Sequence, residues 1–289
     1  MSIAGSPFGN VLKRKWWATP LVHALLVAGS TVFLFPMLWM ISTSLKPIDQ
    51  TMAFPPKWLP EPFQWRNYVD AVNYIPFLQY TINTLMVSGF GIIGAVASNA
   101  LVAYSFARLS WPGRDWLFGL TLATMMIPFP VVMVPLYSVF RELGWIGTLA
   151  PLIVPAYFGS AFNIFLLRQF FLRVPKDMAE AATLDGASEF RIFWTIYVPL
   201  AKPALAVVAL FHFIWAWNDF LGPLLYLTDQ STYTLSLGLQ FYQSQHGGTQ
   251  WHLLMAASTL TVLPVIVIFF LTQRTFLQGI TFLKNVDVN

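Results

Sequence analysis

Six apolar stretches, each long enough to cross a lipid bilayer as a helix, constrain the fold of this chain more than any other feature. A membrane-spanning helix needs about 20 mainly apolar residues to cross a hydrocarbon core of about 30 Å. The composition agrees, because only 10% of the 289 residues are charged, against about 25% in a soluble domain. The sequence therefore predicts an all-α, polytopic membrane protein with six transmembrane helices. The predicted spans are 18–42, 80–106, 116–140, 149–167, 203–227 and 253–271.

The first stretch is predicted to be a retained anchor. It follows Lys13, Arg14 and Lys15, as the apolar region of a signal peptide would. Its apolar run is longer than the roughly 7–15 residues of that region, and no small-residue cleavage site follows it. We therefore expect this segment to stay in the protein as a transmembrane helix.

The basic residues predict how the helices are oriented. Twelve of the 16 lie in the two terminal segments and in alternate connections, and four lie in the remaining connections. Because cytoplasmic segments carry the excess of Lys and Arg, both termini are expected in the cytoplasm. The larger set is Lys13, Arg14, Lys15, Arg108, Arg114, Arg168, Arg173, Lys176, Arg191, Lys202, Arg274 and Lys284, and the smaller is Lys46, Lys57, Arg66 and Arg141.

This orientation divides the chain into two cytoplasmic tails and one transmembrane domain. The tails are residues 1–17 and 276–289, and the domain is residues 18–275. Two outside loops, 44–79 and 229–252, are longer than the third outside connection, and the first is predicted to be a proline-rich cap of turns and short helices. Residues 172–202 form a long cytoplasmic loop between the fourth and fifth spans.

The sequence contains no set of residues that predicts catalysis. No GxxxxGK[ST] phosphate loop, HExxH zinc motif or GxSxG nucleophile elbow occurs. Of the four histidines only His246 and His252 are near each other, and no carboxylate accompanies them. The chain has no cysteine for a disulfide or thiolate site, and no basic stripe favours nucleic acid. We expect no enzymatic activity, no bound metal or cofactor, and no nucleic-acid partner.

Ionisable residues are almost absent from the predicted spans. Asp219 is the only acid well inside one of them. A proton- or ion-coupled carrier usually needs several such groups for its relay. If this protein moves a solute uphill, the energy is expected to come from another subunit.

The long cytoplasmic loop begins with a predicted short helix. Four of the twelve acidic residues fall between Asp177 and Glu189. Asp177 followed by Glu180 has the spacing of a capping box, which predicts a helix start. Gly186 suits the residue after a helix end, so the helix is expected to end near Asp185. The alternative is a solvated loop with incidental helix.

A second amphipathic helix is predicted directly after the first. Its aromatic residues are spaced at i, i+3, i+4 and i+7, which places them on one face. That face is expected to lie against the membrane interface or to pack under the bundle. The residues are Phe190, Phe193, Trp194 and Tyr197.

The order of residues in this loop resembles the EAA loop of the membrane subunits of bacterial ABC importers. Glu180-Ala181-Ala182 is followed by Gly186, Ile196 and the pair Val198-Pro199, with Val198 where the family usually has leucine. Further motifs resemble the maltose-type second permease of the carbohydrate branch, and the resemblance covers nearly the whole chain. They are Pro36–Met40, Asn83-Thr84, Trp215–Phe220, Tyr233–Leu235 and Gln273-Arg274. The tail 282–289 departs from the family pattern.

The resemblance implies a permease subunit of an ATP-driven, binding-protein-dependent carbohydrate importer. Such a subunit is a multi-pass protein of the bacterial plasma (inner) membrane and forms half of the translocation pathway by alternating access. The implied partners are a homologous permease subunit, two ATPase subunits that use ATP and Mg, and an extracytoplasmic solute-binding protein. By resemblance the short helix is the coupling helix that contacts the ATPase through Glu180, Ala181, Ala182, Leu184, Asp185 and Gly186.

The end of the fifth predicted span carries a second group of candidate residues. Asn218 and Asp219 are polar residues expected in its outer half, and Gly222-Pro223 is predicted to break the helix. The pair either lines the pathway or holds the break in shape. The alternatives are a structural hydrogen bond to a neighbouring span and a direct contact with the sugar.

The outside loop 229–252 is the third candidate. It lacks Lys and Arg and carries side chains that suit hydroxyl-rich ligands. By resemblance it faces the solute-binding protein, and the alternative is an ordinary solvated loop. The candidates are Gln240, Tyr242, Gln243, Gln245 and Trp251.

Two other functional classes stay open at this point. A stand-alone secondary carrier would need its own ion relay and usually more spans. A membrane scaffold without a transport role would leave the spacing of Glu180, Ala181, Ala182 and Gly186 unexplained.

Overall fold

The computed structural model describes residues 18–243 and 248–286, with side chains as far as residue 273. Every regular element in these ranges is helical, which confirms the all-α prediction. Four helical runs are long and apolar enough to cross a membrane, and two bent pairs raise the number to as many as six. The single runs lie within α1 (Ala18–Ser44), α4 (Phe77–Arg108), the segment Ala150–Arg173 and α15 (Trp251–Val286).

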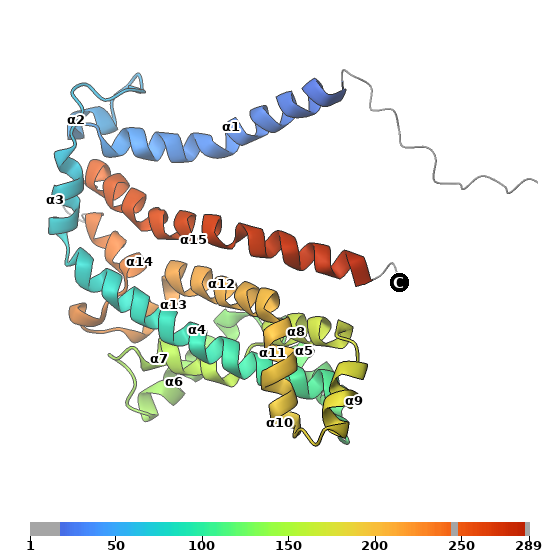
Figure 1. Ribbon diagram of the computed structural model, residues 1–289. Helices are drawn as coiled ribbons and strands as arrows, with labels where there is room; N and C mark the ends of the chain where they lie inside the picture. Colours follow the sequence, from blue (N-terminus) through green and yellow to red (C-terminus); the bar gives the residue numbers. More distant parts are fainter. Residues whose placement is uncertain (1–17, 244–247, 287–289) are drawn as a thin grey trace, which may run out of the picture.

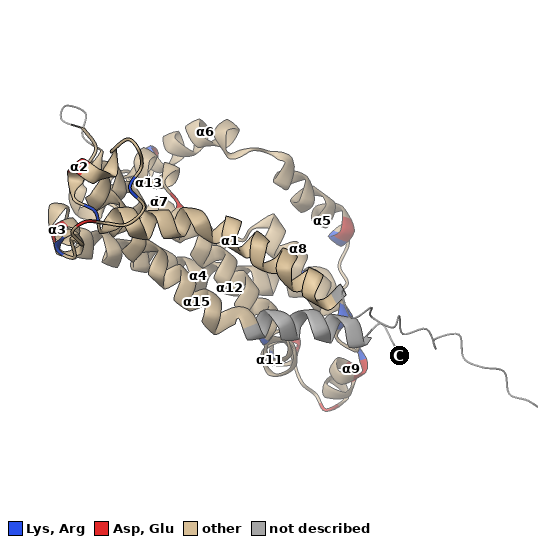
Figure 2. Cartoon of the chain, turned by 90° about the horizontal axis from the view of Figure 1, so that it is seen from above, with Lys and Arg blue, Asp and Glu red and all other residues tan. Residues whose placement is uncertain are grey.

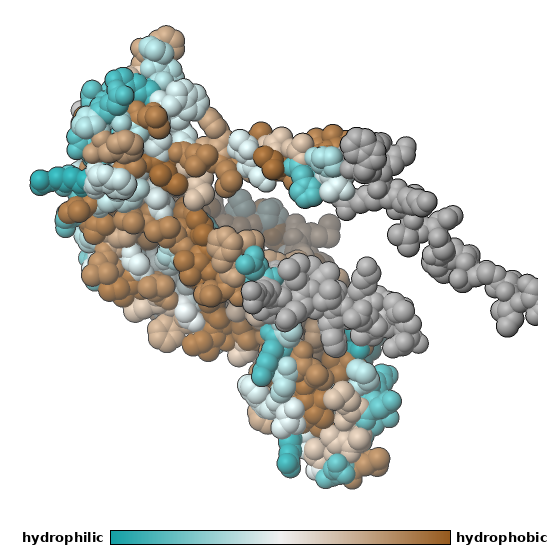
Figure 3. Space-filling model, turned by 45° about the horizontal axis from the view of Figure 1, so that its top comes forward, coloured by the Kyte–Doolittle hydropathy of each residue, from teal (hydrophilic) through white to brown (hydrophobic). Residues whose placement is uncertain are grey.

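The long helices run roughly side by side (Figure 1). Helix α4 packs against α12 (Lys202–Asn218) and α8 (Ala161–Arg173), and α1 packs against α15. Hydrophilic residues gather at two ends of the molecule and an apolar surface lies between them (Figure 3). This distribution is the one that a lipid bilayer demands of a spanning bundle.

The third predicted span is bent rather than continuous. Helix α5 (Arg114–Ala123) and a 3₁₀ turn, η1 (Thr124–Met126), meet α6 (Phe129–Glu142) at 101°. Pro128 and Pro130 lie at the bend, and proline cannot donate the hydrogen bond that would continue the helix. Figure 2 shows α5 and α6 arching away from the other helices. The predicted third span, 116–140, is therefore bent at Pro128 and is not one continuous helix.

The fourth span is divided internally. It consists of α7 (Ala150–Ile153), a 3₁₀ helix η2 (Val154–Phe158) and α8. Gly159 between them has a φ of 83°, which favours glycine. Ser160 then caps α8 by accepting a hydrogen bond from the N–H of Asn163 at 3.5 Å.

The fifth span begins after a sharp turn and ends earlier than expected. The run of α10 (Glu189–Ile192), the π-helical η3 (Phe193–Tyr197) and α11 (Val198–Leu200) meets α12 at 77°. Helix α12 ends at Asn218, and α13 (Leu221–Tyr226) follows. The break therefore lies at residues 219–220, and Gly222-Pro223 belong to α13. A break is present as predicted, one turn before Gly222-Pro223.

Short helices form the outside loops, as the sequence predicts for the first of them. The first loop contains α2 (Ile48–Thr51) and α3 (Arg66–Tyr74). The second contains η4 (Gln230–Thr232), α14 (Leu235–Gly238) and η5 (Leu239–Tyr242). Helix α15 continues to Val286, so the predicted C-terminal tail starts as an extension of this helix. The predicted N-terminal tail, 1–17, lies outside the described residues.

Candidate functional site

The short helix predicted from the polar segment is present as α9 (Asp177–Leu184). Its end has the two hydrogen bonds of a Schellman motif. The N–H of Gly186 donates to the carbonyl of Thr183 at 3.0 Å, and the N–H of Ala187 donates to the carbonyl of Ala182 at 2.9 Å. Gly186 has a φ of 79°, a conformation that costs other L-residues about 1–2 kcal/mol. The predicted end near Asp185 is confirmed.

The start of α9 differs from the predicted capping box. Lys176 already has helical angles and occupies the N-cap position without a side-chain hydrogen bond. Asp177 is consequently the first helical residue, so its carboxylate does not cap the helix as expected. Asp177 and Glu180 still lie in the first turn, where negative charge meets the positive end of the helix dipole.

Helix α9 has one face packed on the bundle and one face open. Ala179 and Ala182 pack against the core cluster formed by α4, α8, η3 and α12. Glu180, Ala181 and Asp185 are exposed, and Leu184 is 89% exposed. The small Ala181 and the protruding Leu184 lie beside the two carboxylates. Together they form a surface that another protein can approach closely.

The aromatic residues after α9 divide into two pairs instead of sharing one face. Phe193 and Tyr197 are buried in the core, whereas Phe190 is 67% and Trp194 is 50% exposed. The π-helical turn over Phe193–Tyr197 is the reason, because its wider repeat changes the spacing on which the single face was predicted.

Two residues near the end of α4 attach this segment to the bundle. The hydroxyl of Tyr104 donates a hydrogen bond to Oε2 of Glu189 at 2.7 Å, and its ring lies 5.1 Å from that of Phe193. The guanidinium of Arg108 donates to the carbonyls of Phe171 and Val174. It also lies 5.0 Å from the centre of the Tyr197 ring.

Sequence reasoning missed both of these roles. It used Arg108 only as an orienting charge. A half-buried arginine with two carbonyl acceptors has no local sequence signature, because its acceptors lie more than 60 residues away in α8 and beyond it. The available signal was the pair Tyr104 and Arg108, which lie four residues apart at the end of a long apolar helix.

The polar residues at the end of α12 have structural partners. The Nδ2 of Asn218 donates to the carbonyl of Ile214 at 2.7 Å, within its own helix. The carboxylate of Asp219 accepts a hydrogen bond from the N–H of Gly222 at 3.1 Å, so it caps the start of α13. A Cβ at Gly222 would come within 2.4 Å of Oδ2 of Asp219. Asp219 thus holds the break in shape, and Gly222 leaves room for its carboxylate.

The second outside loop is fastened to the start of α4. The Nδ2 of Asn83 donates to the carbonyls of Ser231 and Tyr233 at 2.8 and 2.9 Å. The hydroxyl oxygen of Thr84 accepts from the N–H of Leu235 at 2.8 Å. At the beginning of the loop, the N–H and hydroxyl of Ser231 donate to Asp229. These bonds hold the pKa of the Asp229 carboxyl below its usual range.

The candidate residues of this loop do not share one surface. Gln240 and Gln243 are exposed, and Trp251 is half-buried. Tyr242 is fully buried, where its hydroxyl donates to the carbonyl of Ala71 at 2.7 Å and its ring stacks on Tyr74. The side chain of Tyr242 therefore supports the loop and does not face outward as expected. Gln245 lies outside the described residues.

No group of three or more His, Asp or Glu side chains that could hold a metal ion occurs in the described part of the chain. His246, considered above with His252, lies outside that part.

Comparisons with known proteins identify the class to which this fold and these loops belong. The family described as "binding-protein-dependent transport system inner membrane component" matches residues 92–281. The chain belongs to this family. It is therefore a multi-pass inner-membrane transport subunit and not an enzyme, and the family works with a solute-binding protein and with ATPase subunits.

Three curated relatives illustrate the similarity. The diacetylchitobiose uptake system permease protein NgcG of Streptomyces coelicolor is 34% identical over 87% of this chain and 84% of its own length. The probable ABC transporter permease protein YurM of Bacillus subtilis is 30% identical over 93% and 89%. The sn-glycerol-3-phosphate transport system permease protein UgpE of Yersinia pestis is 32% identical over 89% and 94%.

Solved structures share the fold. A chain in the crystal structure of a bacterial ABC transporter involved in the import of the acidic polysaccharide alginate matches with a TM-score of 0.80. It is 23% identical, and the match covers 94% of this chain and 100% of that chain. The alginate transporter in complex with its pentasaccharide-bound periplasmic protein gives a TM-score of 0.66 at 17% identity, over 90% of this chain and 96% of that chain.

Proposed function

We propose that this chain is one of two permease subunits in an ATP-driven, binding-protein-dependent importer of a carbohydrate. It forms half of the translocation pathway and works by alternating access. The carbohydrate class is supported by the relatives that are named for diacetylchitobiose and sn-glycerol 3-phosphate. ATP and Mg are used in the ATPase subunits, since this chain has no phosphate loop.

The proposal rests mainly on the two faces of α9. Its packed face joins the helix to the bundle, and its open face presents Glu180, Ala181, Leu184 and Asp185. A helix closed rigidly by Gly186 and projecting from the bundle is suited to receive a displacement from a second protein. Closure of the ATPase dimer then favours one state of the permease over the other, because the two states contact the ATPase differently.

The orientation follows from the distribution of charge. In the proposed arrangement both termini and α9 lie in the cytoplasm, and the loops 44–79 and 229–252 lie outside. The second loop then faces the solute-binding protein with Gln240 and Gln243.

The proposed second permease subunit covers part of the exposed apolar surface. The hydrophobic window of α1 has no buried residue within this chain. In a membrane this surface contacts lipid or a neighbouring protein helix. A homologous permease is the neighbour that the two-subunit pathway requires.

The coupling role is tested by Leu184→Glu, which adds charge to a side chain that makes no core contact in this chain. We expect the ATPase to be lost from the purified complex and uptake to fall at least tenfold, with normal insertion of the permease. The matched control is Leu59→Glu in the first outside loop, which is also strongly exposed. Normal ATPase retention and uptake in Leu184→Glu would overturn the proposal.

A second test compares two glycines with the same backbone conformation. Gly186 and Gly144 both have positive φ and open space around the position of a Cβ. Replacing either with alanine costs about 1–2 kcal/mol of local strain. Gly186→Ala is expected to reduce ATPase-driven uptake, whereas Gly144→Ala, at the end of α6, leaves it close to normal. Equal effects of both substitutions would argue against a special role for α9.

A further inference from the structure

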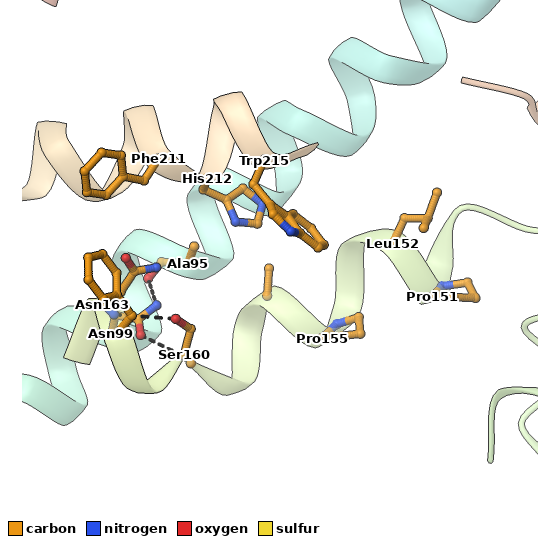
Figure 4. Close-up of a pocket in the computed structure, with 13 residues that line it drawn as sticks. Ala95, Asn99, Pro151, Leu152, Pro155, Ser160, Asn163, Phe211, His212 and Trp215 are labelled. Carbon is orange, nitrogen blue, oxygen red and sulfur yellow. Dashed lines mark hydrogen bonds between the residues drawn. The ribbon is translucent and has the colours of Figure 1, made fainter. Parts of the chain in front are cut away.

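A cavity of about 610 Å³ lies between α4, the divided fourth span and α12 (Figure 4). Its volume is within the roughly 300–1,000 Å³ of small-molecule sites. Ala95 on its wall is about 27 Å from the start of α4 and about 20 Å from its end, at 1.5 Å per residue. The cavity is therefore near the middle of the bundle, far from both the α9 surface and the outside loops.

The wall of this cavity contains irregular backbone at mid-membrane depth. The divided span changes from η2 to α8 at Gly159 and Ser160. Oδ1 of Asn99 accepts a hydrogen bond from the N–H of Ser160 at 2.7 Å, and the hydroxyl of Ser98 donates to the carbonyl of Ala156 at 3.2 Å. Broken backbone in a membrane is tolerated only where protein buries it or where it lines a wet cavity. Here protein side chains satisfy part of the broken backbone, and the cavity lies beside the remainder.

Two polar side chains on the wall have atoms without a partner in the described part of the chain. Asn163 is only 8% exposed, and its Oδ1 accepts no hydrogen bond. The Nε2 of His212 is also buried and unpaired. Gly91 of α4 lets the histidine ring approach, since a Cβ there would be 2.3 Å from Nε2. Buried polar atoms left unpaired are costly. The Asn163 oxygen suits a ligand that brings a hydroxyl donor, whereas Nε2 of His212 faces Gly91.

Aromatic rings complete the wall. Trp215 of α12 is 59% exposed, and the rings of Phe162 and Phe211 lie 5.9 Å apart. In Figure 4, Asn99, Ser160 and Asn163 lie across the space from the side chains of α12. A sugar ring has an apolar face that packs on aromatic rings and hydroxyls that bond to amides. No Lys, Arg, Asp or Glu is among the described residues that line the cavity.

We infer that this cavity is a subsite for one neutral sugar ring of the transported carbohydrate, held between Trp215 and the amide of Asn163. The inference rests on the proposed function and adds a direct substrate contact within this subunit. It also specifies a ring without phosphate or carboxylate at this position, because the wall offers no charged partner for an anion. The competing occupants are a lipid acyl chain and a side chain of a neighbouring helix.

The first test measures whether water and sugar reach the cavity. The chain has no cysteine, so Asn163→Cys and Trp215→Cys each place a single thiol on this subunit. A charged, water-soluble thiosulfonate is applied to the assembled importer in membrane vesicles, with and without a non-hydrolysable ATP analogue. We expect both thiols to react in at least one state and to react several-fold more slowly when a neutral oligosaccharide is loaded through the binding protein.

The matched control is Ile93→Cys, on another face of α4 at nearly the same depth and also 59% exposed. Its thiol is expected not to react with the charged reagent. Unreactive thiols at 163 and 215, which lipid or a packed helix would produce, overturn the inference. Reaction without protection by any sugar overturns it as well.

The second test separates substrate contact from coupling. The assembled importer is assayed with labelled diacetylchitobiose, maltose, cellobiose and sn-glycerol 3-phosphate. Trp215→Ala is expected to lower uptake of the neutral sugar about tenfold, while Trp215→Phe retains most of it. ATP hydrolysis stimulated by the unloaded binding protein is expected to stay within twofold of the unmodified complex.

Different results overturn the proposed carbohydrate function and the proposed sugar subsite. An unmodified importer that takes up none of the panel overturns the proposed carbohydrate function and this inference with it. An unmodified importer that transports a neutral sugar, with Trp215→Ala and Asn163→Leu unchanged, overturns the inference alone.

Discussion

The two ends of α4 hold the proposed coupling segment and the second predicted outside loop by different interactions. At its end, the coupling segment, residues 174–201, is attached through packed aromatic rings and the guanidinium of Arg108. At its start, the loop segment, residues 229–243, is attached through single side chains that bond to backbone, chiefly Asn83 and Thr84. Ring packing spreads the attachment over many contacts, whereas the polar attachment depends on a few atoms. The first suits a segment that transmits force, and the second suits a loop that must keep one shape.

The largest effect is expected from Arg108→Leu, which breaks the coupling attachment at its most polar point. The substitution removes the guanidinium donor from the carbonyls of Phe171 and Val174. The Phe171 carbonyl keeps its hydrogen bond from the N–H of Val174, so the main cost falls on the carbonyl of Val174. We expect a loss of about 3 kcal/mol or more, measured as a lower unfolding midpoint of the purified complex and faster proteolysis within residues 174–201. Arg141→Leu is the control, because the Arg141 side chain is 66% exposed and pairs with the exposed neighbouring Glu142. Equal stability of the two variants would contradict the assigned role of Arg108.

Asn83→Leu breaks the attachment of the loop segment. It removes the donor to the carbonyls of Ser231 and Tyr233, which is worth about 2 kcal/mol. Limited proteolysis is expected to cut within 229–243 while residues 174–201 stay protected. In the control Asn73→Leu the lost bond lies within its own helix and is exposed, so little change is expected. Simultaneous cleavage of both segments would show that the two ends are not independent.

Gly222→Ala tests the break that lies between these two attachments. The added Cβ meets Oδ2 of Asp219 at 2.4 Å and the Leu152 side chain at 3.1 Å. Overpacking of this kind costs about 1–3 kcal/mol. Gly119→Ala in α5 meets nothing within 4 Å, so it is expected to be neutral or to stabilise by up to about 1 kcal/mol. Thermal unfolding of both variants measures the difference, and the same sign for both would refute the close approach at Gly222.

The smallest effect is expected from Tyr104→Phe, which removes one hydrogen bond from the ring-packed attachment and keeps the rings. The lost bond to Glu189 is worth about 1 kcal/mol. Uptake is expected to fall less than threefold, whereas Tyr104→Ala, which also removes contacts with Phe193 and Tyr197, reduces it much further. A Tyr104→Phe variant as impaired as Tyr104→Ala would mean that the hydrogen bond, and not the packing, holds the segment.

Local chemistry explains what the sequence could predict. The apolar stretches could be predicted from their length, and the family from the order of its motif residues. The end of α9 could be predicted from Gly186, which is adjacent to it in the chain. The bend at Pro128 was signalled by its prolines, but their number does not reveal the angle. The wall of the central cavity joins residues about 50 to 120 positions apart, such as Asn99, Asn163 and Trp215, so no local pattern could indicate it.

The unbroken run of α4 has a consequence for how chains of this kind can vary. An α-helix turns by about 100° for each residue. Inserting or deleting one residue between Asn83 and Arg108 would rotate one anchor away from its partners while the other stayed in place. The stretch between these two anchors is therefore bound to a fixed number of residues, because both anchors must face their partners at once.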